Sequence, residues 1–81
     1  WDERPCHLAA ATGHLELLQW ARANECPWSE CTCSLAVEGG HLEILKWARA
    51  NGCPWDVQEC LELAQAGGHA NIEEWIHQQG Q

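Results

Sequence analysis

The chain has few positive charges and no long apolar run. Only four of its 81 residues are Lys or Arg, against twelve Asp and Glu, which gives a formal net charge of −8. Nucleic acids and anionic lipid surfaces are bound by clustered Lys and Arg, so this composition argues against both kinds of partner. No apolar stretch approaches the roughly 20 residues that cross a bilayer as a helix, so we expect no direct membrane insertion.

Met, Phe and Tyr are absent, and the six aromatic residues are all Trp. Because the chain begins with Trp1 and not with Met, we expect that it was processed or cut from a longer protein. Apolar residues make up 46% of the chain and charged residues 20%, which is typical of a folded domain and not of a disordered tail. We expect residues 1–81 to form one small domain.

Signals for catalysis are equally scarce. Ser29 and Ser34 are the only serines, and neither lies in a nucleophile-elbow motif. The glycine pairs Gly39-Gly40 and Gly67-Gly68 are expected to end helices and not to form a phosphate-binding loop. We therefore expect a protein without catalytic activity and without a cofactor.

One stretch of sixteen residues occurs twice with three differences. The dipeptide Gly-His, which opens both copies, recurs a third time, at offsets of 27 and 28 residues. Self-similarity at a fixed spacing indicates a repeat architecture in which neighbouring units bury each other's apolar faces. The copies are GHLELLQWARANECPW at residues 13–28 and GHLEILKWARANGCPW at residues 40–55. The three units cover approximately residues 1–27, 28–54 and 55–81.

Each unit contains two apolar segments separated by Gly. The first segment of unit one, residues 5–12, begins with Pro and ends before Gly, as helices commonly do. The second, residues 14–24, carries its polar side chains on one stripe, which predicts an amphipathic helix. We expect Gly52 to end the second helix of unit two in a left-handed conformation. Glu25 occupies the same slot in unit one, where that conformation costs roughly 1 kcal/mol.

The third unit differs from the others at positions that would face a following unit. Glu73 replaces Leu18, and Gln78 replaces Ala23. Polar residues at these positions would close the stack, as a terminal cap does. We therefore expect the third unit to be a C-terminal cap and the chain to be the C-terminal part of a longer array.

The segment PCHLAAATGH at residues 5–14 resembles the start of an ankyrin repeat, and HLEILKWARANGC at residues 41–53 is similar to the ankyrin second helix with its closing Gly. The resemblance implies an all-α fold, a helical-hairpin solenoid of three repeats. An ankyrin unit has about 33 residues, whereas these units have 27 or 28. Cys-Pro-Trp stands where the family places its β-hairpin, so the solenoid would have shortened hairpin loops.

The resemblance also implies binding of another protein, at the residue before each first helix and at the pair before each Gly-His. In the shortened loops, Trp28 and Trp55 could pack as a ladder between neighbouring loops or supply exposed contacts to a partner. Trp20, Trp47 and Trp75 lie on the apolar side of the second helices, so we expect them in the core. The protein-binding residues expected on these grounds are Glu3, Thr12, Trp28, Glu30, Glu38, Trp55 and Gln58.

Six Cys and five His leave a metal or disulfide hypothesis open. The same spacing separates Cys26 from Cys33 and Cys53 from Cys60, and it would allow a disulfide from each loop to the next helix. Cys also packs well as a small apolar side chain, and the recurring His fits a helix start bonded to backbone. We expect mostly buried thiols, no metal and a reducing intracellular compartment. The residues that come nearest to a zinc pattern are Cys26, Cys31, Cys33 and His41.

Three functions remain open. The first is a non-catalytic protein–protein interaction module that recognises a partner through the solenoid surface. The second is a permanent architectural or spacer subunit of a larger multiprotein assembly, for which a photosynthetic complex would be one host in an algal source. The third is a cysteine-rich protein that responds to metal or redox state.

Overall fold

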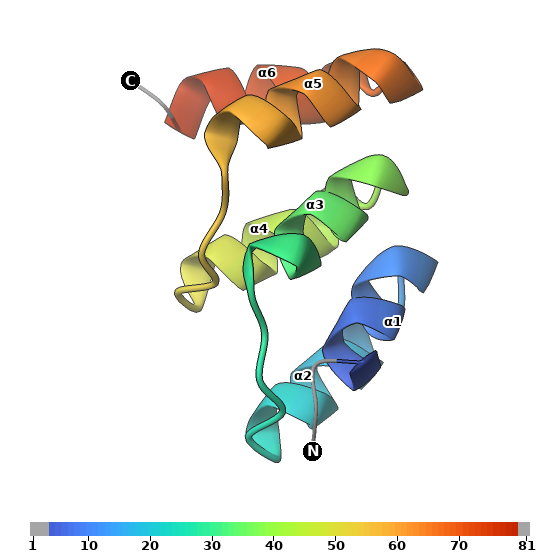
Figure 1. The fold of residues 1–81 in the computed structure, drawn as a ribbon, viewed down its shortest axis with the longest axis vertical. Helices are drawn as coiled ribbons and strands as arrows, with labels where there is room; N and C mark the ends of the chain where they lie inside the picture. The colour runs from blue at the N-terminus through green and yellow to red at the C-terminus, as the bar shows by residue number, and fades with distance from the viewer. Residues whose placement is uncertain (1–3, 80–81) are drawn as a thin grey trace.

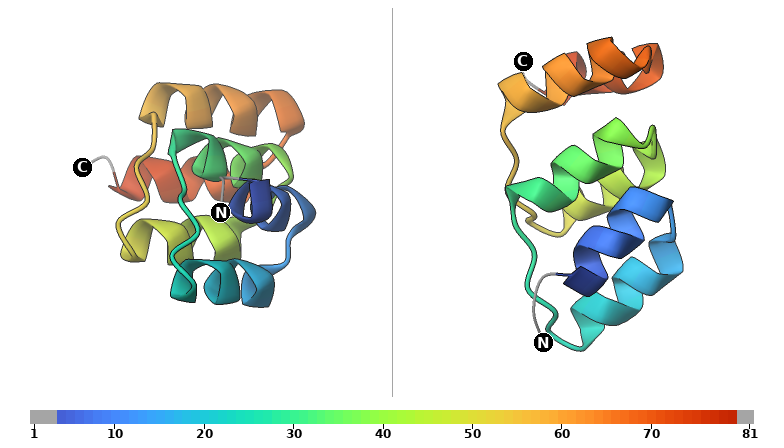
Figure 2. Two further views of the ribbon diagram at one scale, coloured as in Figure 1. Left: turned by 60° about the horizontal axis from the view of Figure 1, so that its bottom comes forward. Right: turned by 45° about the vertical axis from the view of Figure 1, so that its right-hand side comes forward.

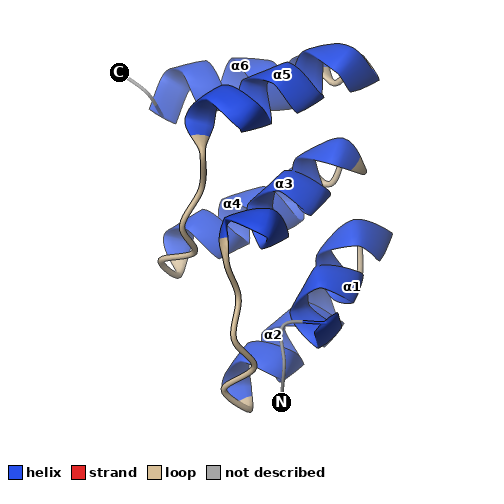
Figure 3. Ribbon diagram, viewed as in Figure 1, coloured by secondary structure: helices blue, strands red, loops and turns tan. Residues whose placement is uncertain are grey.

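The computed structural model describes residues 4–79, and in this range it contains six α-helices and no strand (Figure 3). The predicted all-α class is therefore confirmed, and within the described range no helix is long and apolar enough to cross a membrane. The helices are α1 (Arg4–Thr12), α2 (Leu15–Ala23), α3 (Glu30–Glu38), α4 (Leu42–Ala50), α5 (Val57–Gly67) and α6 (Ala70–Gln79).

The helices form three hairpins that are stacked in chain order, with α1 and α2 at one end and α5 and α6 at the other (Figure 1). The odd-numbered helices make one layer and the even-numbered helices a second (Figure 2). The closest approaches between hairpins join α1 to α3 and α3 to α5. This packing is consistent with a helical repeat, and the described residues span 32 × 23 × 17 Å.

The odd-numbered helices approach one another closely because they bury small side chains. Ala9 in α1 and Cys33 and Ala36 in α3 are fully buried. The even-numbered helices bury larger side chains, such as Leu18 and Leu45. Each such Leu contributes roughly 1.5–3 kcal/mol to folding when it is fully buried. The buried residues form one core that runs through all three hairpins.

Side-chain caps define where α3 and α5 begin. Ser29 accepts a hydrogen bond from a backbone N–H at the start of α3 and forms a capping box with Thr32. Asp56 accepts from the backbone N–H of Glu59 at the start of α5. The two caps are 27 residues apart, whereas the Gly-His motifs that follow these helices are 28 apart. The extra residue of the third unit is therefore accommodated within α5, which has 11 residues against 9 in α3.

The second helices of the first two hairpins end as the sequence predicts. Gly52 has φ +85°, and Glu25, at the equivalent position, has φ +63°. Glu25 therefore keeps the left-handed backbone of the repeat despite its side chain, a conformation that costs a non-glycine residue roughly 1 kcal/mol or more. The packing of the repeat therefore imposes a left-handed backbone on Glu25, although glutamate disfavours that conformation.

The recurring Gly-His motif joins one hairpin to the next. Nε2 of His41 donates a hydrogen bond to the carbonyl oxygen of Ala11, in the preceding hairpin, at 3.2 Å. The imidazole lies so close to two glycines that a Cβ at Gly13 would be 2.7 Å from the ring and a Cβ at Gly39 2.6 Å. A side chain at either glycine would displace this ring, and Gly13 also has φ +80°, a backbone conformation that favours glycine.

The same contact joins the second hairpin to the third. His69 donates from Nε2 to the carbonyl oxygen of Glu38 at 3.3 Å. A Cβ at Gly40 would lie 2.8 Å from the His69 ring, and a Cβ at Gly67 would lie 2.7 Å from it. The expected bond from a helix-start imidazole to backbone is confirmed, and its acceptor belongs to the neighbouring hairpin.

The prediction of a buried Trp on every second helix is wrong for Trp20. Trp47 and Trp75 are half-buried against the core, but Trp20 is 54% exposed. Trp28 packs edge-on against Trp47 with 5.8 Å between ring centroids, and Trp55 does the same with Trp75 at 5.8 Å. The equivalent loop residue for Trp20 is Trp1, which lies outside the described residues. Each loop tryptophan therefore packs on the second helix of the next hairpin and not on the other loop tryptophan.

Candidate interaction surface

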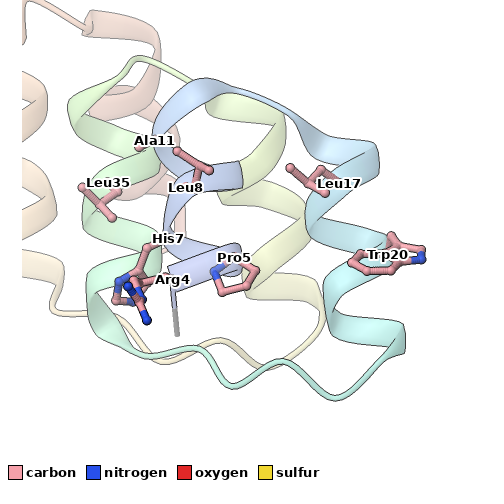
Figure 4. Close-up of a pocket in the computed structure, with 8 residues that line it drawn as sticks. All are labelled: Arg4, Pro5, His7, Leu8, Ala11, Leu17, Trp20 and Leu35. Carbon is pink, nitrogen blue, oxygen red and sulfur yellow. The ribbon is translucent and has the colours of Figure 1, made fainter. Parts of the chain in front are cut away.

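The first hairpin presents an apolar surface at the N-terminal end of the stack, formed by Pro5, Leu8 and Ala11 of α1 with Leu17 and Trp20 of α2 (Figure 4). We call this the N-terminal end face. Leu8 is 60% exposed, and Leu17 is 39% exposed. Leucine side chains this open to water on one contiguous surface are unusual for an isolated folded domain and indicate a contact site.

The repeat itself shows what covers this position elsewhere. Leu17 corresponds to Ile44 in the second hairpin and to Ile72 in the third, which are 2% and 0% exposed. Leu8 corresponds to Leu35 and Leu63, which are both half-buried against the core. The same positions are thus shielded wherever a hairpin precedes them in the stack.

The N-terminal end face is hollowed. It borders a shallow depression of about 880 Å³, which extends to Leu35 of the second hairpin. The polar side chains that line it are those of Arg4 and His7 (Figure 4). An apolar floor with a few polar groups at its edge is the usual make-up of a binding depression.

The opposite end of the stack, formed by α5 and α6, is polar. Gln65 of α5 donates to a carboxylate oxygen of Glu73 of α6 at 2.7 Å. These residues take the places of Val37 and Leu45, which are fully buried in the second hairpin. Gln78 is also exposed, so the polar positions predicted for the last unit do lie in contact with solvent.

Most residues expected from the family resemblance are exposed but do not form one patch. Glu30 and Glu38 lie at opposite ends of α3, about 12 Å apart along the helix axis. Thr12 donates to the carbonyl oxygen of Leu8 at 2.7 Å, and Gln58 donates to Glu62 at 3.1 Å. Glu30 and Gln58 follow the cap residues and lie within the first turns of α3 and α5, not before these helices. The last expected position, Glu3, lies outside the described residues.

Trp28 and Trp55 are held between two neighbours each. The guanidinium of Arg22 lies 4.3 Å from the ring centroid of Trp28, and that of Arg49 lies 4.7 Å from Trp55. Both tryptophans are half-buried against the core. Each ring therefore contacts an arginine of the preceding hairpin and a tryptophan of the next hairpin. Only part of each ring is left for a partner.

The disulfides that the spacing of the cysteines would allow are not formed. No disulfide joins the cysteines within residues 4–79, and five of the six are buried, Cys31 being the exposed one. The disulfides left open for Cys26/Cys33 and Cys53/Cys60 are therefore not formed, and the expectation of mostly buried thiols is confirmed. Sγ of Cys33 lies 3.4 Å from Sγ of Cys53. Among residues 4–79, no three Cys, His, Asp or Glu lie together as metal ligands, so the residues considered for zinc do not meet.

Burial alters the acidity of these thiols. Desolvation, with a hydrogen bond to Cys26, raises the pKa of Cys6 to about 12. Desolvation, with the nearby Glu59 and Asp56 charges, raises the pKa of Cys60 to about 11. Both side chains are therefore neutral thiols that pack as small apolar groups at physiological pH.

Comparisons with protein-family models, with curated proteins and with solved structures found no match to this chain. Function is therefore inferred from the surface of the molecule. The N-terminal end face is the feature that the sequence-based list of binding residues missed. One feature of the sequence could have predicted this face. Unit three has polar residues where the other units are apolar, whereas unit one has no such replacement.

Proposed function

We propose that this chain is a non-catalytic protein-interaction module, built as a shortened ankyrin-like solenoid, which binds a partner protein through its N-terminal end face. The observation that carries the proposal is the contrast between Leu17, 39% exposed, and Ile44, 2% exposed at the same position of the next hairpin. Covering such surface is favourable by roughly 25 cal/mol for each Å² of apolar area removed from water.

The partner that fits this face best is an α-helical hairpin. Within the stack, the equivalent surface of the second hairpin is covered by the helices of the first, chiefly by the packing of α1 on α3. The covering surface contains small or apolar residues such as Ala10 and Leu18, both fully buried. A hairpin with small apolar residues at its contact positions would continue this packing. A preceding unit of the longer array expected from the sequence would do the same, and the proposal assigns the face instead to a hairpin of a separate protein.

A second copy of this chain, added head to tail, fits less well. Its C-terminal end would place Gln65 and Glu73 against Leu17. The carboxylate of Glu73, which lies at the surface with Gln65 and His77 beside it, would have to leave water to pack against leucine, and this is costly. We therefore favour a partner with a different sequence over polymerisation of this chain.

The experiment is affinity capture of the tagged protein from its own cells, with the wild-type chain and with Leu8→Glu/Leu17→Glu. The proposal expects the wild-type chain to bring down a stoichiometric partner that cross-links to α1 and α2. It expects the double variant to lose that partner while it keeps its helical content. The matched control is Glu16→Ala/Glu43→Ala, since both glutamates are exposed on second helices outside the N-terminal end face.

Two results would contradict the proposal. One is a partner retained at the same level by the double variant. The other is a partner whose cross-links map only to α5 and α6. A partner that depends on Leu8 and Leu17 but resists exchange and high salt would instead favour the architectural subunit, which would use the same face permanently.

A further inference from the structure

Two buried sulfur atoms lie in direct contact inside the second hairpin. Sγ of Cys33, in α3, is 3.4 Å from Sγ of Cys53, in the loop that follows α4. Both residues are fully buried. A disulfide bond is about 2.0 Å long, so the two sulfurs need to approach by only roughly 1.4 Å, which is within the reach of small side-chain rotations.

The surroundings distinguish the two sulfurs. The thiol of Cys33 donates to Cys53 Sγ, which raises the pKa of Cys33 and lowers the pKa of Cys53. The guanidinium of Arg49 donates a hydrogen bond to the carbonyl oxygen of Cys53, and its charge also favours the Cys53 thiolate. Cys53 is therefore the better nucleophile, and Cys33 stands beside it as the thiol that can react next.

We propose that Cys33 and Cys53 form a redox-sensitive dithiol, which hydrogen peroxide converts to an intramolecular disulfide between α3 and the loop after α4. The Cys53 thiolate attacks one peroxide oxygen and breaks the O–O bond, which gives a sulfenic acid and hydroxide. The Cys33 sulfur then attacks Cys53 Sγ and displaces the hydroxyl group, which leaves as water with the proton of Cys33. The hydroxide from the first step takes up the proton that the Cys53 thiol released on ionisation. Two thiols are thus oxidised, and one peroxide is reduced to two waters.

The position of Cys53 gives a route for the oxidant. Cys53 belongs to the loop between α4 and α5, outside the helices, directly after Gly52 in its left-handed conformation. Loops of this kind open locally more often than packed helices do, and peroxide is close to water in size. A brief opening of the loop therefore exposes Cys53 while α3 keeps Cys33 in place.

The first hairpin contains the same two positions, and there too the two cysteines interact. Cys6 corresponds to Cys33 and Cys26 to Cys53, with the same separation of 20 residues. There the Cys6 thiol points at the carbonyl oxygen of Cys26, at 3.7 Å. Cys6 thus supplies a matched control, a buried cysteine at the same repeat position whose loss should not affect the proposed bond.

The disulfide would tie the open end of the second hairpin together. A covalent link that closes a loop of this size restricts the unfolded chain and typically stabilises the folded state. For a domain of this length we expect the melting temperature to rise by roughly 10 °C. The oxidised form would therefore hold α3 and the loop after α4 together more rigidly.

The test uses the full chain with Cys31→Ser, which removes the exposed thiol and its intermolecular reactions. The folded protein is treated with a small excess of hydrogen peroxide, remaining thiols are alkylated, and linked peptides are mapped by mass spectrometry. Two further variants, Cys33→Ala and Cys6→Ala, are treated in the same way. Melting temperature is measured before and after oxidation and again after reduction.

The proposal expects a linked Cys33–Cys53 peptide, loss of two hydrogen atoms in the intact mass, and a reversible rise in melting temperature. Cys6→Ala should retain all three results, and Cys33→Ala should lose them. Absence of the Cys33–Cys53 peptide, whether other cysteines are linked instead or none is, would overturn the proposal. Because the decisive readout comes from the chain with both cysteines present, it does not depend on the alanine variants folding.

Discussion

The imidazole of His41 lies against the backbone of Gly13 in the preceding hairpin, so close that a Cβ at Gly13 would be 2.7 Å from the ring. His69 stands in the same relation to Gly40. Each ring also donates to a carbonyl oxygen of the preceding hairpin. His41 and His69 of the Gly-His motif are therefore contacts between hairpins, and the glycine of each motif also has a positive φ.

Gly67→Ala should lower the free energy of unfolding in the wild-type chain and raise it when His69 is already Ala. The added Cβ would meet the His69 ring at 2.7 Å, and Gly67 lies in α5, where Ala is the better helix former. We expect a loss of about 1–2 kcal/mol in the first case and a gain of up to about 1 kcal/mol in the second. Urea denaturation of the four chains measures both, and equal signs in the two backgrounds would contradict this account.

Glu25→Gly should stabilise the chain by about 1 kcal/mol, because Gly adopts the left-handed backbone of this position without a steric penalty. Gly52→Ala tests the converse at the equivalent position and should cost a similar amount. A Cβ at Gly52 would meet no atom within 4 Å, so backbone strain is the sole cause tested. The melting temperature should rise for Glu25→Gly and fall for Gly52→Ala. A shift of both melting temperatures in the same direction would refute the idea.

Trp47→Ala should destabilise the chain by roughly 3 kcal/mol or more, because the ring packs on the core and on Trp28. Trp20→Ala should cost at least about 2 kcal/mol less, because Trp20 is 54% exposed. The comparison isolates burial, since the two residues occupy the same repeat position. Equal losses in guanidinium denaturation would show that Trp20 belongs to the core after all.

Stability should fall as pH rises above 9, partly because of Cys60. The pKa of this thiol is about 11 in the folded chain, against an ordinary value of 9.0. Between these values the unfolded chain releases a proton that the folded chain retains, so alkaline pH favours unfolding by about 1.4 kcal/mol per pH unit for this group. Cys60→Ala should make the decline between pH 9 and 11 shallower by that amount, and parallel curves would exclude the effect.

The helical hairpins could be predicted because their signals are local. Pro5, the Gly-His pairs and the polar stripe of each second helix fix where helices start, end and face. The acceptor of His41 could not be predicted, because Ala11 lies thirty residues away and is reached only when hairpins stack. The Cys33–Cys53 contact escaped prediction for the same reason, since the equal spacing along the chain raised only the pairs Cys26/Cys33 and Cys53/Cys60 as an alternative to free thiols.

The N-terminal end face shows a second limit of the pattern. Periodicity places Leu17 and Trp20 on the apolar side of a helix, but it does not show which part of that side a neighbouring hairpin covers. Leu18, the next residue, is fully buried, whereas Leu17 is 39% exposed. That difference depends on how the described hairpins stack, because Leu18 belongs to their common core and Leu17 does not.

Hydroxyl-radical footprinting of Leu8 and Leu17 in the native complex and in the isolated chain tests the proposed function most directly. We expect strong labelling of both side chains in the isolated chain and protection of at least about fivefold in the complex, because Leu17 is 39% exposed whereas Ile44, at the same position of a covered hairpin, is 2% exposed. The exposed Glu16 and Glu43 serve as internal references. Equal labelling of Leu8 and Leu17 in both samples would contradict the assignment of the N-terminal end face as the binding surface.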